Sequence, residues 1–167
     1  RGHASTHVEV GVVIIEAILL IGFALPFWAQ RVEAFPVGPD VVRIRAVAYQ
    51  FGWAFHYPGP DGKFGRVDKD LYVTTPTGLD REDPNGIDDI VQVGSLTMPK
   101  DRPVVIDITS KDVIHNLSMV PLRVSQDAIP GTEYPMWFTP ITTGEWDIIC
   151  GQLCGAGHGS MRALYTV

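Results

Sequence analysis

Cysteine is scarce in this sequence: only Cys150 and Cys154 occur among 167 residues. Because both lie in one short segment, they cannot form the long-range disulfide framework that stabilises many small secreted domains. The sequence also contains no Cys-x-x-Cys-His motif for covalent haem attachment and no internal repeat. Any role of the two cysteines must therefore be local.

Basic side chains are outnumbered by acidic ones, with 13 Lys and Arg against 19 Asp and Glu. Residues 34–167 alone carry 11 basic and 16 acidic side chains, a net charge of -5. This balance argues against a nucleic-acid partner, because binding to phosphates requires a basic surface. An acidic surface would suit a basic docking partner, and it would equally serve solubility.

Only one hydrophobic run is long, and it lies near the N-terminus. Residues 8–29, VEVGVVIIEAILLIGFALPFWA, would span ~33 Å as a helix, about the thickness of bilayer hydrocarbon. Without a basic leader or a small-residue cleavage site, the run predicts a transmembrane helix rather than a cleaved signal peptide. We assign residues 1–33 to this region and residues 34–40 to a linker containing Pro and Gly.

Two acidic residues, Glu9 and Glu16, interrupt the hydrophobic run. They are seven residues apart and so fall on nearly the same helical face. An ionisable group at membrane depth costs roughly 2.5 kcal/mol or more unless it meets protein or water. We therefore expect this face to pack against a larger membrane protein, with solvation at the membrane surface as the alternative for Glu9.

Residues 41–167 have the pattern of an all-β domain. Short segments rich in valine, isoleucine and aromatic residues occur at 41–49, 89–98, 102–110, 145–150 and 162–167, separated by turn-rich segments. No amphipathic helix stands between them, which favours a sandwich or a small barrel. The stretch 74–89 is predicted to be a long acidic surface loop.

The most informative segment is CGQLCGAGHGSM, residues 150–161. It places Cys150, Cys154, His158 and Met161 in one loop, between two strand-like segments that would hold its ends rigidly. Thiolate, imidazole and thioether form a soft ligand set that favours copper over Mg or Ca. The glycines between these residues allow the backbone to fold back tightly. The loop is therefore predicted to surround a metal centre.

A further ligand should come from elsewhere in the chain. His115 is the best candidate, because it follows a predicted strand that can lie beside the loop. His3 and His7 precede the membrane helix, and His56 lies in an aromatic run where packing or surface exposure is the simpler role.

Three other kinds of site in this loop would leave some of its residues without a role. A local disulfide would leave His158 and Met161 unexplained. A zinc site would use two cysteines and two histidines but not Met161, and a mononuclear blue-copper site would use only one thiolate. Two thiolates favour two metal ions.

The Cys-x-x-x-Cys-x-x-x-His-x-x-Met pattern of residues 150–161 resembles the CuA domain of haem-copper oxidase subunit II at every ligand position. Residues 112–131, DVIHNLSMVPLRVSQDAIPG, are similar to the family segment that supplies the first histidine. The membrane run also fits, since the family's second transmembrane helix begins with a glutamate and ends in Ala-Leu-Pro, as Glu9 and residues 24–26 do here.

The resemblance implies a cupredoxin-like Greek-key sandwich or barrel for residues 41–167, holding a binuclear copper centre, CuA. Both thiolates would bridge the two ions, each imidazole would bind one ion, and a thioether and a backbone carbonyl would complete the two shells. The implied ligands are His115, Cys150, Gln152 through its carbonyl oxygen, Cys154, His158 and Met161.

The function implied is that of the subunit through which electrons enter a respiratory cytochrome c oxidase. Cytochrome c or a similar small carrier would be the donor, and a haem of subunit I the acceptor, for O2 reduction coupled to proton translocation. Glu9 matches a family glutamate at the cytoplasmic mouth of a proton channel. The expected location is the bacterial cytoplasmic membrane, with the N-terminus cytoplasmic and the copper domain periplasmic.

Two positions depart from the family pattern. Gln152 replaces a glutamate that also binds magnesium in many members, so we predict no magnesium site, and glutamine here is similar to the B-type branch. In the aromatic run 48–59, Phe51 stands where the first tryptophan of the family's electron-accepting patch usually stands, and Trp53 matches the second. Aromatic packing within a small sandwich is the alternative role for this run.

Three other functions fit the sequence less well. The CuA domain of a nitrous oxide reductase would use the same copper site, but the transmembrane helix argues against it. A copper chaperone also has Cys-x-x-x-Cys, but on a thioredoxin-like fold that needs helices. The quinol-oxidase form of this subunit lacks the copper ligands, which are all present here.

Overall fold

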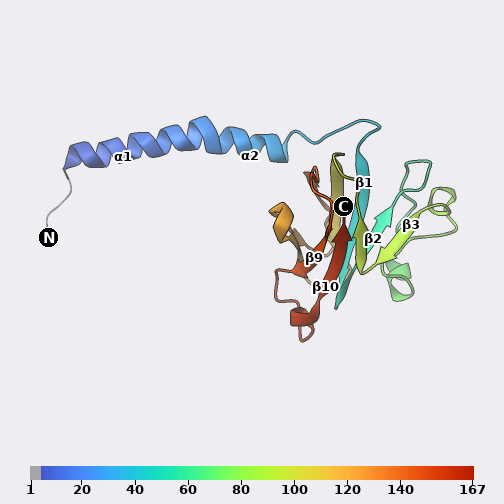
Figure 1. Cartoon of the computed structure of the whole chain (residues 1–167). Helices are drawn as coiled ribbons and strands as arrows, with labels where there is room; N and C mark the ends of the chain where they lie inside the picture. The colour runs from blue at the N-terminus through green and yellow to red at the C-terminus, as the bar shows by residue number, and fades with distance from the viewer. Residues whose placement is uncertain (1–4) are drawn as a thin grey trace. The chain divides into compact units, whose positions relative to one another are not determined.

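The computed structural model describes residues 5–167; His3 lies outside the described residues. The chain divides into two units, one ending at Phe35 and one beginning at Pro36. Figure 1 shows a helical segment in the first unit and a β domain in the second.

The first unit is a helix built from α1 (Thr6–Leu19), a π-helical turn (Leu20–Ala24) and α2 (Leu25–Val32). In the part of the chain that is described, this 27-residue segment is the one helix long and apolar enough to cross a membrane, with a mean hydropathy of 2.5 over its most apolar window. None of its side chains is buried within the chain. Such an apolar surface must be covered by lipid or by another protein.

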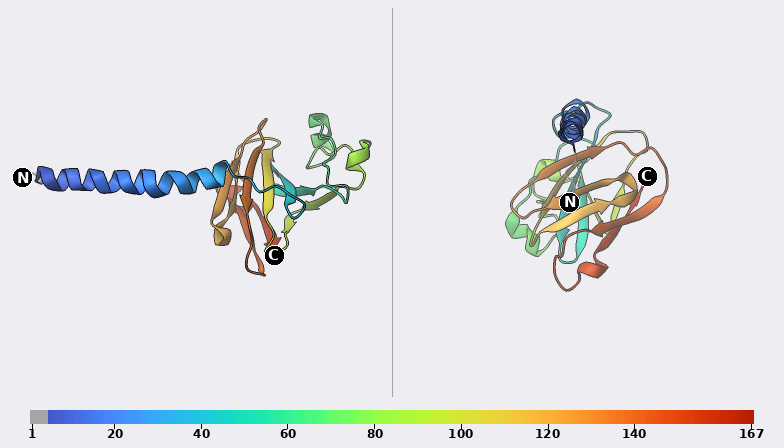
Figure 2. Two further views of the ribbon diagram at one scale, coloured as in Figure 1. Left: turned by 90° about the horizontal axis from the view of Figure 1, so that it is seen from above. Right: turned by 90° about the vertical axis from the view of Figure 1, so that its left-hand side faces the viewer.

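The second unit is a sandwich of two five-stranded sheets (Figures 1 and 2). One sheet has the order β3-β2-β1-β5-β8, and the other β4-β10-β9-β6-β7. The strands are β1 (Val42–Tyr49), β2 (Gly52–Tyr57), β3 (Ile90–Val93), β4 (Ser95–Thr97), β5 (Val104–Ser110), β6 (His115–Met119), β7 (Val124–Ala128), β8 (Tyr134–Phe138), β9 (Glu145–Cys150) and β10 (Arg162–Thr166). Short 3-10 turns occur at Lys69–Val73, Pro84–Gly86, Val120–Leu122 and His158–Ser160. The all-β prediction with one N-terminal helix is confirmed.

The core lies between the two sheets and follows the two-residue repeat of the strands. Inward-facing side chains such as Ile106 and Ile108 of β5 meet Leu117 of β6 and Ile148 of β9. The predicted strand 89–98 is divided at Gly94, whose φ of +72° few other residues adopt. Its two halves, β3 and β4, therefore belong to different sheets.

The segment 58–89 differs from the predicted surface loop. It covers the outer face of β2, where His56 is fully buried against Phe64, with ring centroids 5.1 Å apart. Within the segment, Leu79 and Asp89 are also buried. A strand with both faces covered reads as a continuous apolar run, as β2 does, but its sequence does not say which segment covers the outer face.

Candidate metal centre

Two neighbouring strands bring the first two predicted ligands together. His115, Leu117 and Met119 alternate along β6 toward the core, and Ile148 and Cys150 do so along β9. Leu117 pairs with Cys150 in the antiparallel register. His115 at the start of β6 and Cys150 at the end of β9 therefore reach the same end of the core, with His115 Nδ1 4.0 Å from Cys150 Sγ.

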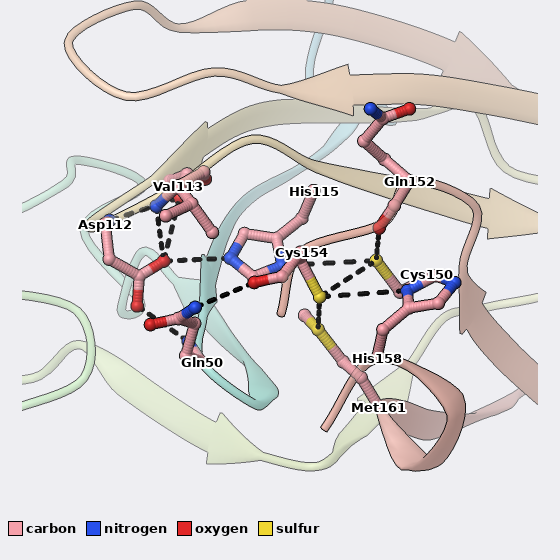
Figure 3. Close-up of polar contacts among 10 residues, drawn as sticks. Gln50, Asp112, Val113, His115, Cys150, Gln152, Cys154, His158 and Met161 are labelled. Carbon is pink, nitrogen blue, oxygen red and sulfur yellow. Dashed lines mark hydrogen bonds and ion pairs between the residues drawn. The ribbon is translucent and has the colours of Figure 1, made fainter. Parts of the chain in front are cut away.

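The loop after β9 folds back over this end of the sandwich (Figure 3). Cys154 Sγ lies 3.8 Å from Cys150 Sγ, 3.8 Å from His158 Nδ1 and 3.7 Å from Met161 Sδ. The carbonyl oxygen of Gln152 lies 3.2 Å from Cys150 Sγ. All six predicted ligands thus converge on one small volume.

The two cysteines are free. Their sulfur separation of 3.8 Å is nearly twice the ~2.05 Å of a disulfide bond, which argues against the local disulfide. Burial, followed by the neighbouring Cys150, raises the pKa of Cys154 to about 11. At neutral pH this thiol is protonated in the metal-free protein, and a metal ion would have to displace its proton.

Asp112 orients His115. Its Oδ1 accepts a hydrogen bond of 2.8 Å from His115 Nε2, which leaves Nδ1 directed at the sulfurs. Burial acts to raise the pKa of Asp112, but hydrogen bonds from His115 and from the backbone N–H groups of Gln50 and Val113 outweigh it and lower the pKa. An ionised carboxylate behind a ligating imidazole is a common arrangement in metal sites, since it fixes both the tautomer and the ring orientation.

The donor set suits copper. The ligand atoms of His115, Cys150 and Cys154 lie within 4.8 Å of one another, and all three residues are buried. Two free thiols, two imidazole Nδ1 atoms and one thioether form a soft set, whereas hard cations require oxygen ligands. A zinc site would leave Met161, which is only 2% exposed, without a role.

The two predicted electron-accepting aromatics lie in different environments. Phe51, at the tip of the β1–β2 hairpin, is 40% exposed. Trp53 is fully buried, and its ring lies edge-on to that of His115 with centroids 6.2 Å apart. Phe51 can touch a partner protein and Trp53 cannot.

The remaining predicted positions lie outside this cluster. Glu9 is in the first turn of α1. His56 has a packing role, because its Nε2 bonds Asp89 Oδ2 at 2.5 Å inside the β domain. Sequence reasoning missed Asp112 and Gln50 as parts of the site. Asp112 precedes His115 by three residues, which offered a weak signal, and Gln50 lies in the run 48–59, which the resemblance linked to electron entry and not to the ligands.

Comparison with known proteins agrees with this geometry. Residues 42–166 match the family model described as cytochrome c oxidase subunit II, periplasmic domain. An alternative cytochrome c oxidase subunit 2 from Bradyrhizobium diazoefficiens is 37% identical over 145 residues, covering 86% of this chain and 51% of the relative. The chain thus spans about half the length of that relative.

Two solved structures are similar in fold. The periplasmic domain of subunit II of cytochrome oxidase from Bradyrhizobium japonicum has 27% identity and a TM-score of 0.55, over 79% of this chain and 86% of that one. One chain of a haem-copper terminal oxidase dimer matches over 96% of this chain and 99% of its own length, with a TM-score of 0.56 and 20% identity. These matches confirm the cupredoxin-like fold. The chain belongs to the cytochrome c oxidase subunit II family, whose periplasmic-domain model residues 42–166 match.

Proposed function

We propose that this chain is the subunit through which electrons enter a respiratory cytochrome c oxidase, and that it holds the binuclear copper centre CuA. The observation that carries the proposal is the pair of free, buried sulfurs 3.8 Å apart, each with an imidazole Nδ1 within 4.0 Å. A mononuclear blue-copper site would use only one of the two thiolates and a zinc site would leave Met161 without a role, whereas two copper ions would use the whole set. The match to the oxidase family favours this function over a nitrous oxide reductase.

In this proposal the thiolates of Cys150 and Cys154 and the imidazoles of His115 and His158 would hold two copper ions. Met161 and the carbonyl oxygen of Gln152 complete the two shells. When bound, copper would supply one-electron redox chemistry at this site. The protein's task is to keep the ligands still, which the hydrogen bond between Asp112 and His115 and the two strands at the loop ends accomplish.

The donor would be cytochrome c or a similar small carrier. The net charge of -5 on residues 34–167 would attract a basic donor and raise its encounter rate. Phe51 is the exposed aromatic beside the ligand loop, and buried Trp53 lies next to His115. We infer that the donor contacts Phe51, and that Trp53 lies on the inner side of the path to the copper ligands.

The acceptor would be a haem of subunit I within the membrane. The apolar helix has no buried side chain of its own, and it carries Glu9 and Glu16 on one face. Contact with subunit I would cover that face. The N-terminus would then be cytoplasmic and the β domain periplasmic in a bacterial cytoplasmic membrane.

Glu9 would stand at the cytoplasmic mouth of a proton channel. Glu9→Gln should slow proton-coupled turnover of the assembled oxidase while leaving reduction of copper by cytochrome c unchanged. Stopped-flow reduction and steady-state oxygen uptake separate the two steps. Turnover equal to that of the wild type would remove this role without affecting the copper centre.

The function is tested on the full chain in detergent, loaded with copper and mixed with reduced cytochrome c. We expect two copper ions per chain by elemental analysis and rapid oxidation of the cytochrome by the loaded protein only. The metal-free protein is the control. One copper ion or none per chain, or a loaded protein that accepts no electrons, would contradict the proposal.

A further inference from the structure

The tip of the β1–β2 hairpin supplies none of the predicted ligands, yet it contacts both segments that do. The side-chain Nε2 of Gln50 donates a 2.7 Å hydrogen bond to the carbonyl oxygen of Cys154. The backbone N–H of the same residue donates a 2.7 Å hydrogen bond to Asp112 Oδ2. Figure 3 shows Gln50 between Asp112 and the cysteine loop.

These bonds form a continuous connection across the site. Asp112 Oδ1 accepts from His115 Nε2 at 2.8 Å. Gln50 therefore joins the peptide of Cys154 to the carboxylate that orients His115. The three residues are distant in sequence, and only the hairpin brings Gln50 between the other two.

Cys154 is the ligand that most needs such support. The β6–β9 pairing fixes Cys150 directly, because Leu117 pairs with Cys150 and the N–H of Gly151 donates to Asn116 O at 3.1 Å. Cys154 lies four residues beyond the end of β9, where no strand pairing holds it. The hydrogen bond from Gln50 fixes the backbone at this position instead.

The loop is shaped to receive the hairpin tip. Gly155 has a φ of +134°, and a Cβ placed there would lie 2.8 Å from Gln50 Nε2 and 3.1 Å from the ring of Phe51. Any larger residue would push the hairpin away from the loop, besides being strained. The close fit at Gly155 is independent of the hydrogen bonds and indicates the same contact.

We propose that Gln50 is a positioning residue of the copper centre, which holds Cys154 and, through Asp112, His115 at a fixed separation. This inference rests on the proposed function. Its physical basis is that groups hydrogen-bonded behind metal ligands restrict ligand movement, and that their removal weakens metal binding by about 10- to 100-fold. Since Gln50 is exposed, we expect the lower end of that range.

The test compares Gln50→Met with Gln92→Met in the full chain. Methionine has nearly the shape of glutamine but cannot donate to Cys154 O. Gln92 lies on β3, which carries no predicted ligand, and its side chain accepts a 2.9 Å hydrogen bond from Tyr57. Both changes remove one glutamine hydrogen bond, but only the first removes one at the site.

We expect Gln50→Met to lose copper to a chelator about tenfold faster than the wild type, with an altered copper hyperfine pattern in its electron paramagnetic resonance spectrum. Gln92→Met should match the wild type in its rate of copper loss and in its hyperfine pattern. The thermal midpoints of the two metal-free variants should be alike, which separates positioning from general stability.

Copper loss from Gln50→Met at the wild-type rate would overturn the inference, as would equal acceleration in Gln92→Met. A wild-type chain that binds no copper pair would instead contradict the proposed function. The two failures are therefore distinguishable in one experiment.

Discussion

The β domain has two irregular segments, the ligand loop 150–161 and the segment 58–89 that covers β2, here called the covering segment. Their buried polar groups differ in what they contact. In the covering segment, Asp89 accepts hydrogen bonds from His56 Nε2 and from the backbone N–H groups of Gly59 and Gly65. In the ligand loop, the sulfur and imidazole groups lie 3.7–3.8 Å from one another, and His115 Nδ1 of β6 lies 4.0 Å from Cys150 Sγ. A buried group with protein partners stabilises the fold, whereas converging soft donors form a place for metal ions.

The largest effect should follow from Cys154→Ser, which removes one bridging sulfur. We expect at most one copper ion per chain and loss of the purple colour that a thiolate-bridged copper pair would give, because a serine hydroxyl is a poor copper ligand. The change should leave the metal-free fold nearly intact. Elemental analysis measures the copper content and absorption spectra the colour, with Ser160→Ala in the same loop as control. Two retained copper ions would show that Cys154 is not a bridge.

A substitution in the covering segment should lower the stability of the fold and leave the copper content unchanged. Asp89→Ala leaves His56 and two backbone N–H groups without their acceptor, which should lower the free energy of unfolding by about 3 kcal/mol. Copper per folded chain should stay unchanged. Guanidinium unfolding of the metal-free chain measures the first quantity, with exposed neighbour Asp88→Ala as control. Loss of copper at unchanged stability would contradict the view that Asp89 stabilises the fold and takes no part in copper binding.

A smaller effect is expected from Asp112→Ala, which belongs to the ligand region but binds no metal itself. Without its carboxylate, His115 loses the partner of Nε2, and copper affinity should fall about tenfold. Chelator competition measures this. The control is Asp107→Ala, whose carboxylate bonds Arg43 at 2.8 Å on the other sheet. Equal affinities in both variants would deny Asp112 an orienting role.

The smallest effect concerns pH. Burial lowers the pKa of His56 from its ordinary value of 6.5, with Asp89 opposing the shift and Arg45 and Arg81 adding to it. The unfolded chain then binds the proton more readily, so stability is full above pH 6.5 and falls as pH drops below it, by at most about 1.4 kcal/mol per pH unit.

This dependence is measured as the difference between the wild type and His56→Gln, which cannot titrate. Unfolding of both metal-free chains between pH 5 and 7.5 cancels the contributions of the other histidines. Parallel curves would mean that His56 does not titrate differently in the folded and unfolded states.

The proximity of the four loop side chains could be predicted from the sequence, because they lie within twelve residues, where spacing nearly determines proximity. His115 was also predictable, since a residue that opens an inward-facing strand must approach the loop. Gln50 and Asp112 were not identified, because their contacts depend on a hairpin and a turn brought together by tertiary packing. Trp53 was placed at an electron-accepting patch, although both faces of β2 are covered and its ring is buried.

The most direct test of the central claim is the electron paramagnetic resonance spectrum of the oxidised, copper-loaded chain, recorded together with its copper content. An unpaired electron shared between two bridged copper ions gives a many-line hyperfine pattern from both nuclei, in a purple protein with two copper ions per chain. A pattern from one copper nucleus, or a copper-loaded protein without the purple colour, would contradict the account.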